Sequence, residues 1–411
     1  MKKILLGICM AVLVLCACGG KTQDGSYSPE AGDAETQSET KKTQTEQQTA
    51  IQPETVINTE SGSNAQTVTK PQESQEQDVI LQILNSMTLE EKVGQMFFVR
   101  CPENGAIEDI SRYHLGGYLL FGRDFAGKTQ EEVKAMTAAY QDASEIPLFI
   151  GVDEEGGSVV RISSNEALWN HKFLSPQEIF QAQGTEGFLT DTADKASMLA
   201  LYGINVNFAP VCDVSTDAAD FIYKRSLGQD AQATSDFAGT VVEVMQNYRI
   251  ASVLKHFPGY GNNVDTHTGI AVDNRGYETF KESDFLPFLS GIHAGAEFIL
   301  VSHNIVICMD SELPASLSPA VHEVLRRELL FEGIILTDDL AMEALNAYSQ
   351  EKRSAVLAVL AGNDMIVTTD YAEQIPIVIE AVQNKEIDIS VIDDAVYRIL
   401  SIKHKLGIIS R

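Results

Sequence analysis

Length, composition and charge narrow the possible functions of this chain. Its 411 residues carry 58 acidic against 30 basic side chains, which gives a formal net charge of −28 at pH 7. Proteins that bind nucleic acid concentrate Lys and Arg on one face, so this balance argues against nucleic acid and against electrostatic binding to anionic lipid.

The first residues have the pattern of an export signal. Two lysines follow Met1, and residues 4–15 form an apolar run that is too short to span a bilayer comfortably. We therefore predict a signal peptide over residues 1–17 rather than a transmembrane helix. The run ends in LCAC, which resembles the bacterial lipobox and implies cleavage before Cys18 and a lipid on its thiol. The alternative is an ordinary signal peptide whose cysteines are incidental.

A polar segment follows over residues 18–77. It is rich in Gln, Thr, Ser and Glu and contains a single aromatic residue after Cys18 and no leucine. Such a composition cannot bury enough apolar surface to offset its ordering entropy, so we expect a disordered tether with a reach of roughly 40 Å. With lipid at Cys18, the tether would hold the protein at a membrane on the extracytoplasmic side of the cell envelope.

Cysteine usage shows no disulfide or zinc pattern. Of six cysteines, three lie in the signal region. The other three are scattered along the chain and match neither a disulfide framework nor a CxxC or Cys/His zinc spacing. We expect these three to be buried apolar residues: Cys101, Cys212 and Cys308.

Residues 78–411 form the expected folded domain, in which strand-like apolar runs alternate with helical stretches. The runs are short and rich in Val, Ile, Leu and Phe, as in parallel strands buried on both faces. They cover residues 94–99, 116–121, 148–152, 205–209, 252–255, 297–302, 333–337 and 364–368. Eight β/α alternations predict an α/β fold, a (β/α)8 TIM-like barrel that makes a single catalytic domain. The alternative is a doubly wound open sheet, but no GxGxxG follows the first strand.

Helical periodicity fills the intervals between the predicted strands. Residues 129–144 and 318–330 have apolar side chains at helical spacing, and Thr88 with Glu91 has the spacing of a capping box. In a barrel of this kind the chemistry belongs at the carboxyl ends of the strands. Ionisable residues do follow the third to seventh predicted strands, so we expect a site there.

The motif TDDLAM, residues 337–342, follows the seventh predicted strand directly. A carboxylate at a strand mouth can attack an anomeric carbon, although an aspartate there is also a good helix N-cap. Two adjacent aspartates allow both roles. The longer run VLRRELLFEGIILTD, residues 324–338, resembles the active-site signature of glycoside hydrolase family 3, and this resemblance implies that Asp338 is the nucleophile.

The segment KHFPGYGNNVDTH, residues 255–267, ends the fifth predicted strand and continues into a Gly/Pro-rich loop. On spacing alone, Asp265 beside His267 is equally an acid–orienter pair or a solvated surface turn. The string resembles the β-N-acetylhexosaminidase branch of the family. That resemblance implies that His267 is the acid/base, that Asp265 assists it, and that Lys255 and His256 bind substrate. Here GNN replaces the branch's usual GDT, the loop is one residue shorter, and threonine replaces serine at position 266.

Two further segments supply candidate binding groups. VDEEGGSVVR, residues 152–161, frames a glycine turn with Asp153 and Arg161, which either hold sugar hydroxyls or pair to stabilise the loop. The segment resembles the family's sugar-binding segment, and KRS at residues 224–226 resembles its arginine–serine turn, which implies a binding role for Asp153, Arg161 and Arg225. No role is predicted for Asp213, His303 or Trp169.

The resemblance implies a retaining β-N-acetylglucosaminidase that releases terminal β-linked GlcNAc from cell-wall or other glycan fragments. The intermediate would be a glycosyl ester of Asp338. If His267 were not the acid/base, the proton donor would be sought among the loop carboxylates Glu154 and Glu155. Neither a metal nor an organic cofactor is implied. We expect a monomer whose partners are a carbohydrate and, through the lipid, a membrane.

Three alternatives remain open at this point. Two of them lie within the family: a β-glucosidase and an N-acetylglucosaminide phosphorylase. Family β-glucosidases usually take the acid/base from a second domain, which favours the glucosaminidase here. A lipid-anchored glycan-binding protein without catalytic activity is the third, although the intact signature around Asp338 argues against idle catalytic groups.

Overall fold

The fold is a parallel β-barrel surrounded by helices. The computed structural model describes residues 72–263, 271–342, 345 and 353–409. Its eight barrel strands pair in parallel in the order β10-β1-β2-β3-β4-β5-β7-β9. They are β1 (Phe97–Arg100), β2 (Gly117–Leu120), β3 (Phe149–Val152), β4 (Val206–Asn207), β5 (Ala251–Phe257), β7 (Phe298–Val301), β9 (Ile334–Thr337) and β10 (Ile366–Thr368). A parallel bridge between Leu336 and Met365 joins the two ends of this order. The predicted (β/α)8 barrel is confirmed.

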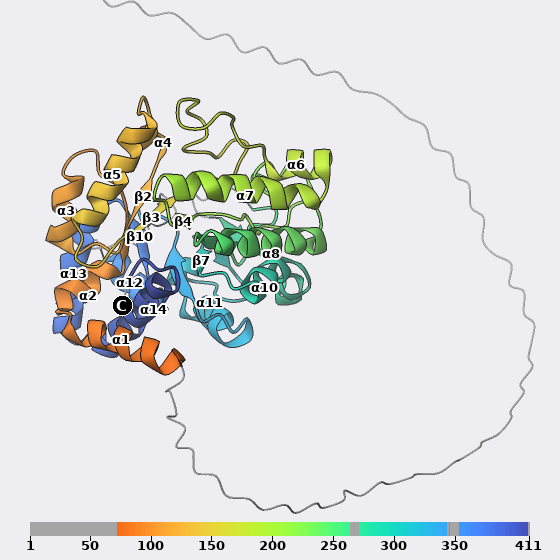
Figure 1. Ribbon diagram of the computed structural model, residues 1–411. Helices are drawn as coiled ribbons and strands as arrows, with labels where there is room; N and C mark the ends of the chain where they lie inside the picture. Colours follow the sequence, from red (N-terminus) through yellow and green to blue (C-terminus); the bar gives the residue numbers. More distant parts are fainter. Residues whose placement is uncertain (1–71, 264–270, 343–344, 346–352, 410–411) are drawn as a thin grey trace, which may run out of the picture. The chain divides into compact units, whose positions relative to one another are not determined.

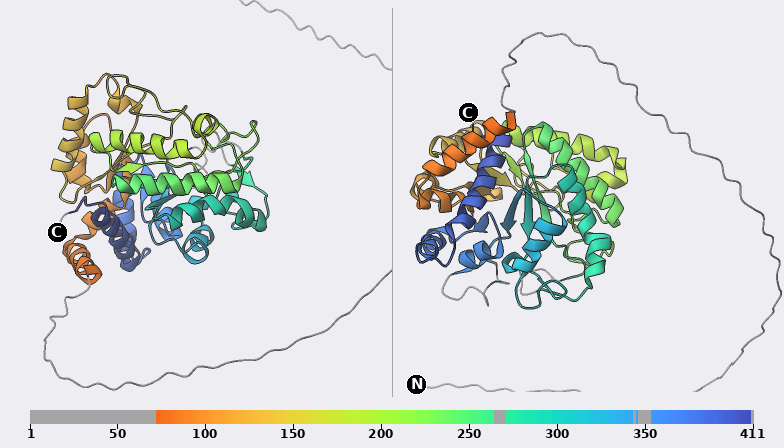
Figure 2. Two further views of the ribbon diagram at one scale, coloured as in Figure 1. Left: turned by 45° about the vertical axis from the view of Figure 1, so that its right-hand side comes forward. Right: turned by 90° about the horizontal axis from the view of Figure 1, so that it is seen from below.

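The helices form a ring around the strands, as the view from below shows (Figure 2, right). The larger ones are α1 (Gln72–Ser86), α2 (Leu89–Gln95), α3 (Ala106–Tyr113), α5 (Gln130–Asp142), α6 (Pro176–Gln183), α7 (Glu186–Leu201), α8 (Ala231–Asn247), α10 (Phe285–His293), α12 (Ser354–Ala361), α13 (Tyr371–Gln383) and α14 (Ile389–Lys405). Helix α1 packs against α14 and begins ahead of the expected domain start at residue 78 (Figure 1). No helix in the described part of the chain is long and apolar enough to cross a bilayer.

The start of α2 follows a local sequence signal, whereas two other predicted boundaries differ from the structure. Thr88 caps α2 through a capping box, in which its Oγ accepts the Glu91 N–H at 3.2 Å and the Glu91 carboxylate accepts the Thr88 N–H at 2.6 Å. Because α2 runs on to Gln95, the first strand starts at Phe97 and not at residue 94. The expected helix over residues 318–330 is a short α11 (Pro319–Glu323) followed by a π-helical segment (Val324–Glu328).

Aromatic side chains fill the centre of the barrel. The Phe98 ring lies 6.1 Å from that of Phe149 and 5.2 Å from that of Phe208, and Phe149 contacts Phe298 at 5.1 Å. Gly151 permits this close packing, because a Cβ there would lie 2.8 Å from the Phe98 ring. Alternate residues of a strand face the same side. A residue two positions after one of these aromatic side chains therefore also points inward, nearer to the barrel mouth.

A lysine is buried at the opposite, amino-terminal end of the barrel. Lys403 of α14 donates a hydrogen bond from Nζ to Gln95 Oε1 at 2.7 Å and lies 5.0 Å from the Phe149 ring centroid. Burial lowers the pKa of Lys403 from 10.5 to about 7. The charged or neutral state of this side chain therefore depends on pH near neutrality.

A small second sheet lies beside the mouth. Its two strands, β6 (Val272–Asp273) and β8 (Ile305–Val306), pair in parallel. Each follows a barrel strand in the chain, β6 after β5 and β8 after β7. Arg275 ties this sheet to the barrel wall, since it donates to Asp273 Oδ2 at 2.8 Å, to Asp284 Oδ1 at 2.8 Å and to the Gly259 carbonyl at 3.1 Å.

Candidate active site

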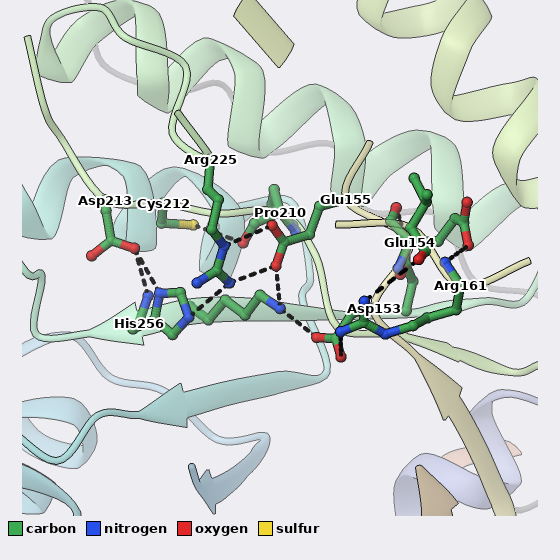
Figure 3. A network of polar contacts seen from close by, with 12 residues as sticks. Asp153, Glu154, Glu155, Arg161, Pro210, Cys212, Asp213, Arg225 and His256 are labelled. Carbon is green, nitrogen blue, oxygen red and sulfur yellow. Dashed lines mark hydrogen bonds and ion pairs between the residues drawn. The ribbon is translucent and has the colours of Figure 1, made fainter. Parts of the chain in front are cut away.

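An ion-pair network crosses the barrel mouth from β3 to β5 (Figure 3). Lys255 at the end of β5 places Nζ 2.7 Å from Asp153 Oδ1 and 2.7 Å from Glu155 Oε1. Arg225 forms a fork with Glu155, from Nη2 to Oε1 at 2.7 Å and from Nε to Oε2 at 3.0 Å. Bidentate pairs of this kind fix both orientation and position, so each cation presents a defined set of remaining N–H groups.

Arg161 joins the same network through Asp153, at 3.1 Å between Nη2 and Oδ2. The loop that carries it is held by Glu154, a fully buried carboxylate that accepts the backbone N–H groups of Arg161 and Ile162 at 2.8 Å each. Asn207 at the end of β4 fixes this loop in turn, since its Oδ1 accepts the Glu154 N–H at 3.0 Å. The Asp153–Arg161 pair thus does stabilise the loop, and it does so beside the other predicted binding groups.

His256 is held at the mouth by Asp213. The Asp213 Oδ2 atom lies 2.8 Å from His256 Nδ1 and accepts the His256 backbone N–H at 3.1 Å, while Oδ1 accepts the Tyr260 N–H at 2.8 Å. His256 Nε2 lies 3.3 Å from Arg225 Nη2. The position of Asp213, a few residues after the fourth strand, was the only signal for this role in the sequence.

Asp338 continues the ladder of β9, because its N–H donates to the Val301 carbonyl at 3.0 Å. Ile334 is the register partner of Phe298, whose ring contacts Phe149 inside the barrel. Ile334 and Leu336 therefore face inward, and Ile335 between them packs under the outer helices. Alternation therefore puts Asp338 on the inner side, at the mouth. Its Oδ1 accepts the Asp339 N–H at 2.9 Å.

The neighbouring Asp339 has a different environment. Burial raises the pKa of its carboxyl group, and the adjacent negative charge of Asp338 acts in the same direction. The Asp339 carbonyl lies 3.0 Å from Nε2 of His303, a fully buried side chain whose Nδ1 lies 2.7 Å from Ser316 Oγ. His303 thereby fixes the backbone that carries the two aspartates.

Neither loop carboxylate named above as a substitute proton donor suits that role. Burial by itself would raise the pKa of the Glu155 carboxyl, but the charges of Lys255 and Arg225 outweigh it and hold the pKa well below its usual range. Glu154 is enclosed by the N–H groups that it accepts. Both side chains are committed to holding neighbouring groups in place.

Comparison with known proteins identifies the family. The model of the glycosyl hydrolase family 3 N-terminal domain matches residues 88–402. The chain belongs to glycosyl hydrolase family 3. A beta-hexosaminidase of Methylobacillus flagellatus is 31% identical over 282 residues, which are 65% of this chain and 78% of that protein. The chain is therefore a glycoside hydrolase.

Solved structures of family 3 share the barrel. A glycoside hydrolase family 3 beta-N-acetylglucosaminidase from Paenibacillus sp. FPU-7 superposes with a TM-score of 0.74 and 28% identity over 79% of this chain and 64% of that one. A beta-N-acetylhexosaminidase from Beutenbergia cavernae gives a TM-score of 0.70 and 29% identity over 78% of this chain and 99% of that one. The chain thus covers less than two thirds of the Paenibacillus structure and nearly all of the Beutenbergia one.

Several predicted site residues of this family 3 chain lie outside the described residues. They are Asp265, His267 and Cys18. The residues on either side of the 264–270 interval are described: Asn263 donates from Nδ2 to Asp273 Oδ2 at 2.7 Å, and the Ala271 carbonyl accepts the Ile305 N–H at 2.8 Å. Both residues that flank the interval therefore form a hydrogen bond with the small β6–β8 sheet.

The remaining candidates have structural explanations. Trp169 packs against the main hydrophobic core. Cys101 and Cys212 are buried as expected, but the expectation was wrong for Cys308, which lies after the buried β8 strand and beside the exposed Ile307 and is itself exposed. Within the described residues, no three His, Cys, Asp or Glu side chains gather in a way that would hold a metal ion.

Proposed function

We propose that this family 3 enzyme is a retaining β-N-acetylglucosaminidase that removes terminal β-linked GlcNAc through a glycosyl ester of Asp338. The observation that carries the proposal is the position of Asp338, on the inner side of β9 and facing the same mouth as the Asp153–Lys255–Glu155–Arg225 network. A retaining glycosidase needs one nucleophilic carboxylate beside a pocket that fixes the sugar. The printed names of the relatives, hexosaminidases and a glucosaminidase, support the same substrate class.

The network supplies the sugar-binding groups. Asp153, Arg161, Lys255, Arg225 and His256 are the groups proposed to contact the hydroxyls and the N-acetyl group of the terminal sugar. Glu155 keeps the two central cations in place, since its ionised form is favoured over the whole neutral range. Preorganised charged donors of this kind add orientation without requiring reorganisation during the reaction.

The chemistry has two steps. Asp338 attacks the anomeric carbon, and the bond to the leaving oxygen breaks as His267 gives that oxygen its proton. Water then attacks the glycosyl ester while His267 takes its proton, which releases the sugar with its original configuration and regenerates both groups. Asp265 is proposed to orient the imidazole of His267.

The location of the enzyme is a second part of the proposal. The LCAC motif that ends at Cys18 and the polar residues up to 77 support a lipid anchor followed by a tether. We infer a monomeric enzyme at the extracytoplasmic side of the cell envelope, acting on cell-wall or other glycan fragments.

A substrate panel tests the activity. The purified enzyme is incubated with 4-nitrophenyl β-GlcNAc, β-glucoside and β-GalNAc, each with and without phosphate. We expect the β-GlcNAc compound to be cleaved with the highest kcat/KM and to give free sugar. A clear preference for the β-glucoside would contradict the proposed substrate.

A slow fluorosugar substrate followed by peptide mass spectrometry tests the nucleophile. The sugar should appear on the peptide that contains Asp338, and Asp338→Ala should reduce turnover by several orders of magnitude, on the scale known for removed nucleophiles. Asp217→Ala, at an exposed aspartate, is the matched control. Labelling of Asp339 instead of Asp338 would overturn the assignment.

A further inference from the structure

Arg100 is a cation at the barrel mouth that neither the proposed reaction nor the ion-pair network uses. It ends β1 and lies on the same side of that strand as Phe98, whose ring is inside the barrel. The guanidinium carbon of Arg100 lies 4.2 Å from the ring centroid of Phe121, the residue after β2. Arg161 lies over the same ring at 5.4 Å, so two guanidinium groups share one aromatic side chain.

Within the part of the chain that the structure describes, the other cations of the mouth pair with carboxylates, whereas Arg100 does not. Arg161, Lys255 and Arg225 share the carboxylates of Asp153 and Glu155. Among the described residues, Arg100 has no carboxylate within ion-pair distance, and its Nε–H is buried without a hydrogen-bond partner. A buried donor without an acceptor costs free energy that a bound acceptor would recover.

Two carboxylates lie near enough to interact electrostatically with Arg100, and each is already engaged. Asp124 accepts the Phe121 N–H at 2.7 Å and lies 3.7 Å from Nε of Arg123, and Asp339 accepts the Ala341 N–H at 3.0 Å. The charge of Arg100 lowers the pKa of both, although burial, the larger effect, raises each of them. Arg100 thus stands between β10 and β2 in the strand order, close to the segment that carries Asp338, and its Nε–H donates to none of the described residues.

We propose that Arg100, next to Arg161, binds an oxyanion at the active site. A guanidinium fork recognises planar carboxylates and phosphates through two parallel hydrogen bonds. The inference rests on the proposed function, which makes the terminal sugar GlcNAc. Because GlcNAc is neutral, the oxyanion belongs either to the group beyond that sugar or to free phosphate. Arg100 therefore selects substrates in which GlcNAc is joined to an acidic residue, or it holds phosphate as an alternative acceptor to water.

Substrates that differ only in charge test the first source. One is a disaccharide of GlcNAc β-linked to a sugar that carries a carboxylate, and the other is the methyl ester of the same compound. We expect the wild-type enzyme to favour the acid and the acid-to-ester ratio of kcat/KM to fall about tenfold or more in Arg100→Met, mainly through KM. Methionine keeps an apolar stem against Phe121. Arg100→Lys, which keeps the charge without the fork, should restore part of the ratio.

Inorganic phosphate tests the second source. If phosphate is the ligand, the wild-type enzyme releases GlcNAc 1-phosphate in place of part of the free sugar, and Arg100→Met loses this product. The matched control in both experiments is Arg112→Met, since Arg112 is exposed and lies over Tyr113 at 5.1 Å, outside the barrel mouth. Its acid-to-ester ratio and its product distribution should equal those of the wild type.

A binding measurement separates this inference from the proposed function. The melting temperature is measured with increasing phosphate, and with the free acidic sugar, at constant ionic strength adjusted with chloride. A rise in the wild type that is absent in Arg100→Met supports the oxyanion site even if no GlcNAc substrate is cleaved. If Arg100→Met matches the wild type in the acid-to-ester ratio, the product distribution and both melting curves, Arg100 binds no oxyanion and the proposal is wrong.

Discussion

His267 is the residue whose replacement should separate natural from activated substrates. Acid assistance matters most when the leaving group is poor, because a good leaving group departs without a proton. His267→Ala should therefore cripple hydrolysis of a GlcNAc disaccharide and spare much of the first step with a 4-nitrophenyl glycoside. The intermediate should then accumulate, and azide should rescue turnover because it attacks the ester without base assistance.

The control for this prediction is His171→Ala, at an exposed histidine that pairs with Asp194 at 3.3 Å. It should behave as the wild type with both substrates. Equal slowing of both substrates by His267→Ala, with no azide rescue, would mean that His267 is structural. Glu154 and Glu155 would be poor replacements in that case, for the reasons given by their contacts.

Asp213 offers a second prediction at this scale. Because it accepts from both the ring and the backbone of His256, Asp213→Asn should loosen a group proposed to bind substrate and lower kcat/KM by about tenfold, the value of one charge-assisted hydrogen bond. Asp217→Asn, at an exposed aspartate of the same loop, should leave kcat/KM unchanged.

The sequence predicted part of this site and missed the rest for a physical reason. Asp153, Arg161, Arg225, Lys255 and His256 were predicted from motifs, and the fold brings all of them to one end of the barrel. Their binding roles remain predictions. The acids that orient them were not assigned, because the distance between two strand ends depends on the barrel order and not on spacing along the chain. Asp213 and His256, for example, are 43 positions apart in the sequence.

Arg275 connects the β6–β8 sheet to the loop after β5 and to the segment that leads into α10. Arg275→Met would leave Asp273 and Asp284 buried without their cation, which typically destabilises a protein by about 3–5 kcal/mol. We expect a lower urea midpoint with an unchanged m-value. Lys281→Met, which removes an exposed pair with Glu278 and a contact at 5.8 Å with the Tyr277 ring, should change the free energy of unfolding by about 0.5 kcal/mol or less.

Element types were easier to predict than element ends. All eight barrel strands were predicted, since most of them are short apolar runs buried on both faces. The strands β6 and β8 were missed because two residues give no periodicity to detect. The helical pattern over residues 318–330 did not reveal its π-helical part, since apolar spacing hardly differs between one turn of an α-helix and one of a π-helix.

The buried Lys403 should make the stability of the folded protein depend on pH. In the unfolded chain this side chain stays protonated up to a pKa of about 10.5, whereas in the folded protein it loses its proton above about 7. The unfolded state therefore binds more protons between these values, and the free energy of unfolding should rise with pH by up to about 1.4 kcal/mol per unit from pH 7 to 9. Above pH 9 the Cys101 thiol, whose pKa burial raises to about 11, acts in the opposite direction.

Urea unfolding at pH 7, 8 and 9 measures this effect. Lys403→Met should flatten the dependence, since methionine fills a similar volume without a titrating group. Lys134→Met, at an exposed lysine of α5, should keep the slope of the wild type. A slope that survives in Lys403→Met would assign the effect to another group.

Membrane attachment is a further prediction for the whole chain. Cys18→Ser removes the thiol proposed to carry lipid, so the protein should move from the membrane fraction to the soluble fraction of cells. The activity of the released protein per molecule should equal that of the wild type, because Cys18 lies outside the family 3 domain at residues 88–402. A Cys18→Ser protein that stays with the membrane through salt washes would argue against the anchor.

The closure of the barrel by β10 has a consequence for how the chain is made. Strand β10 pairs with β1 and joins β9 through the Leu336–Met365 bridge. The sheet therefore closes only when residues near the start of the domain pair with residues near its end. Until then two strands expose unpaired N–H and carbonyl groups, which favour pairing between different chains. A chain interrupted before Ile366 would keep both edges open and should aggregate. In the full chain, a pairing between strands so distant in sequence should make closure of the sheet slow.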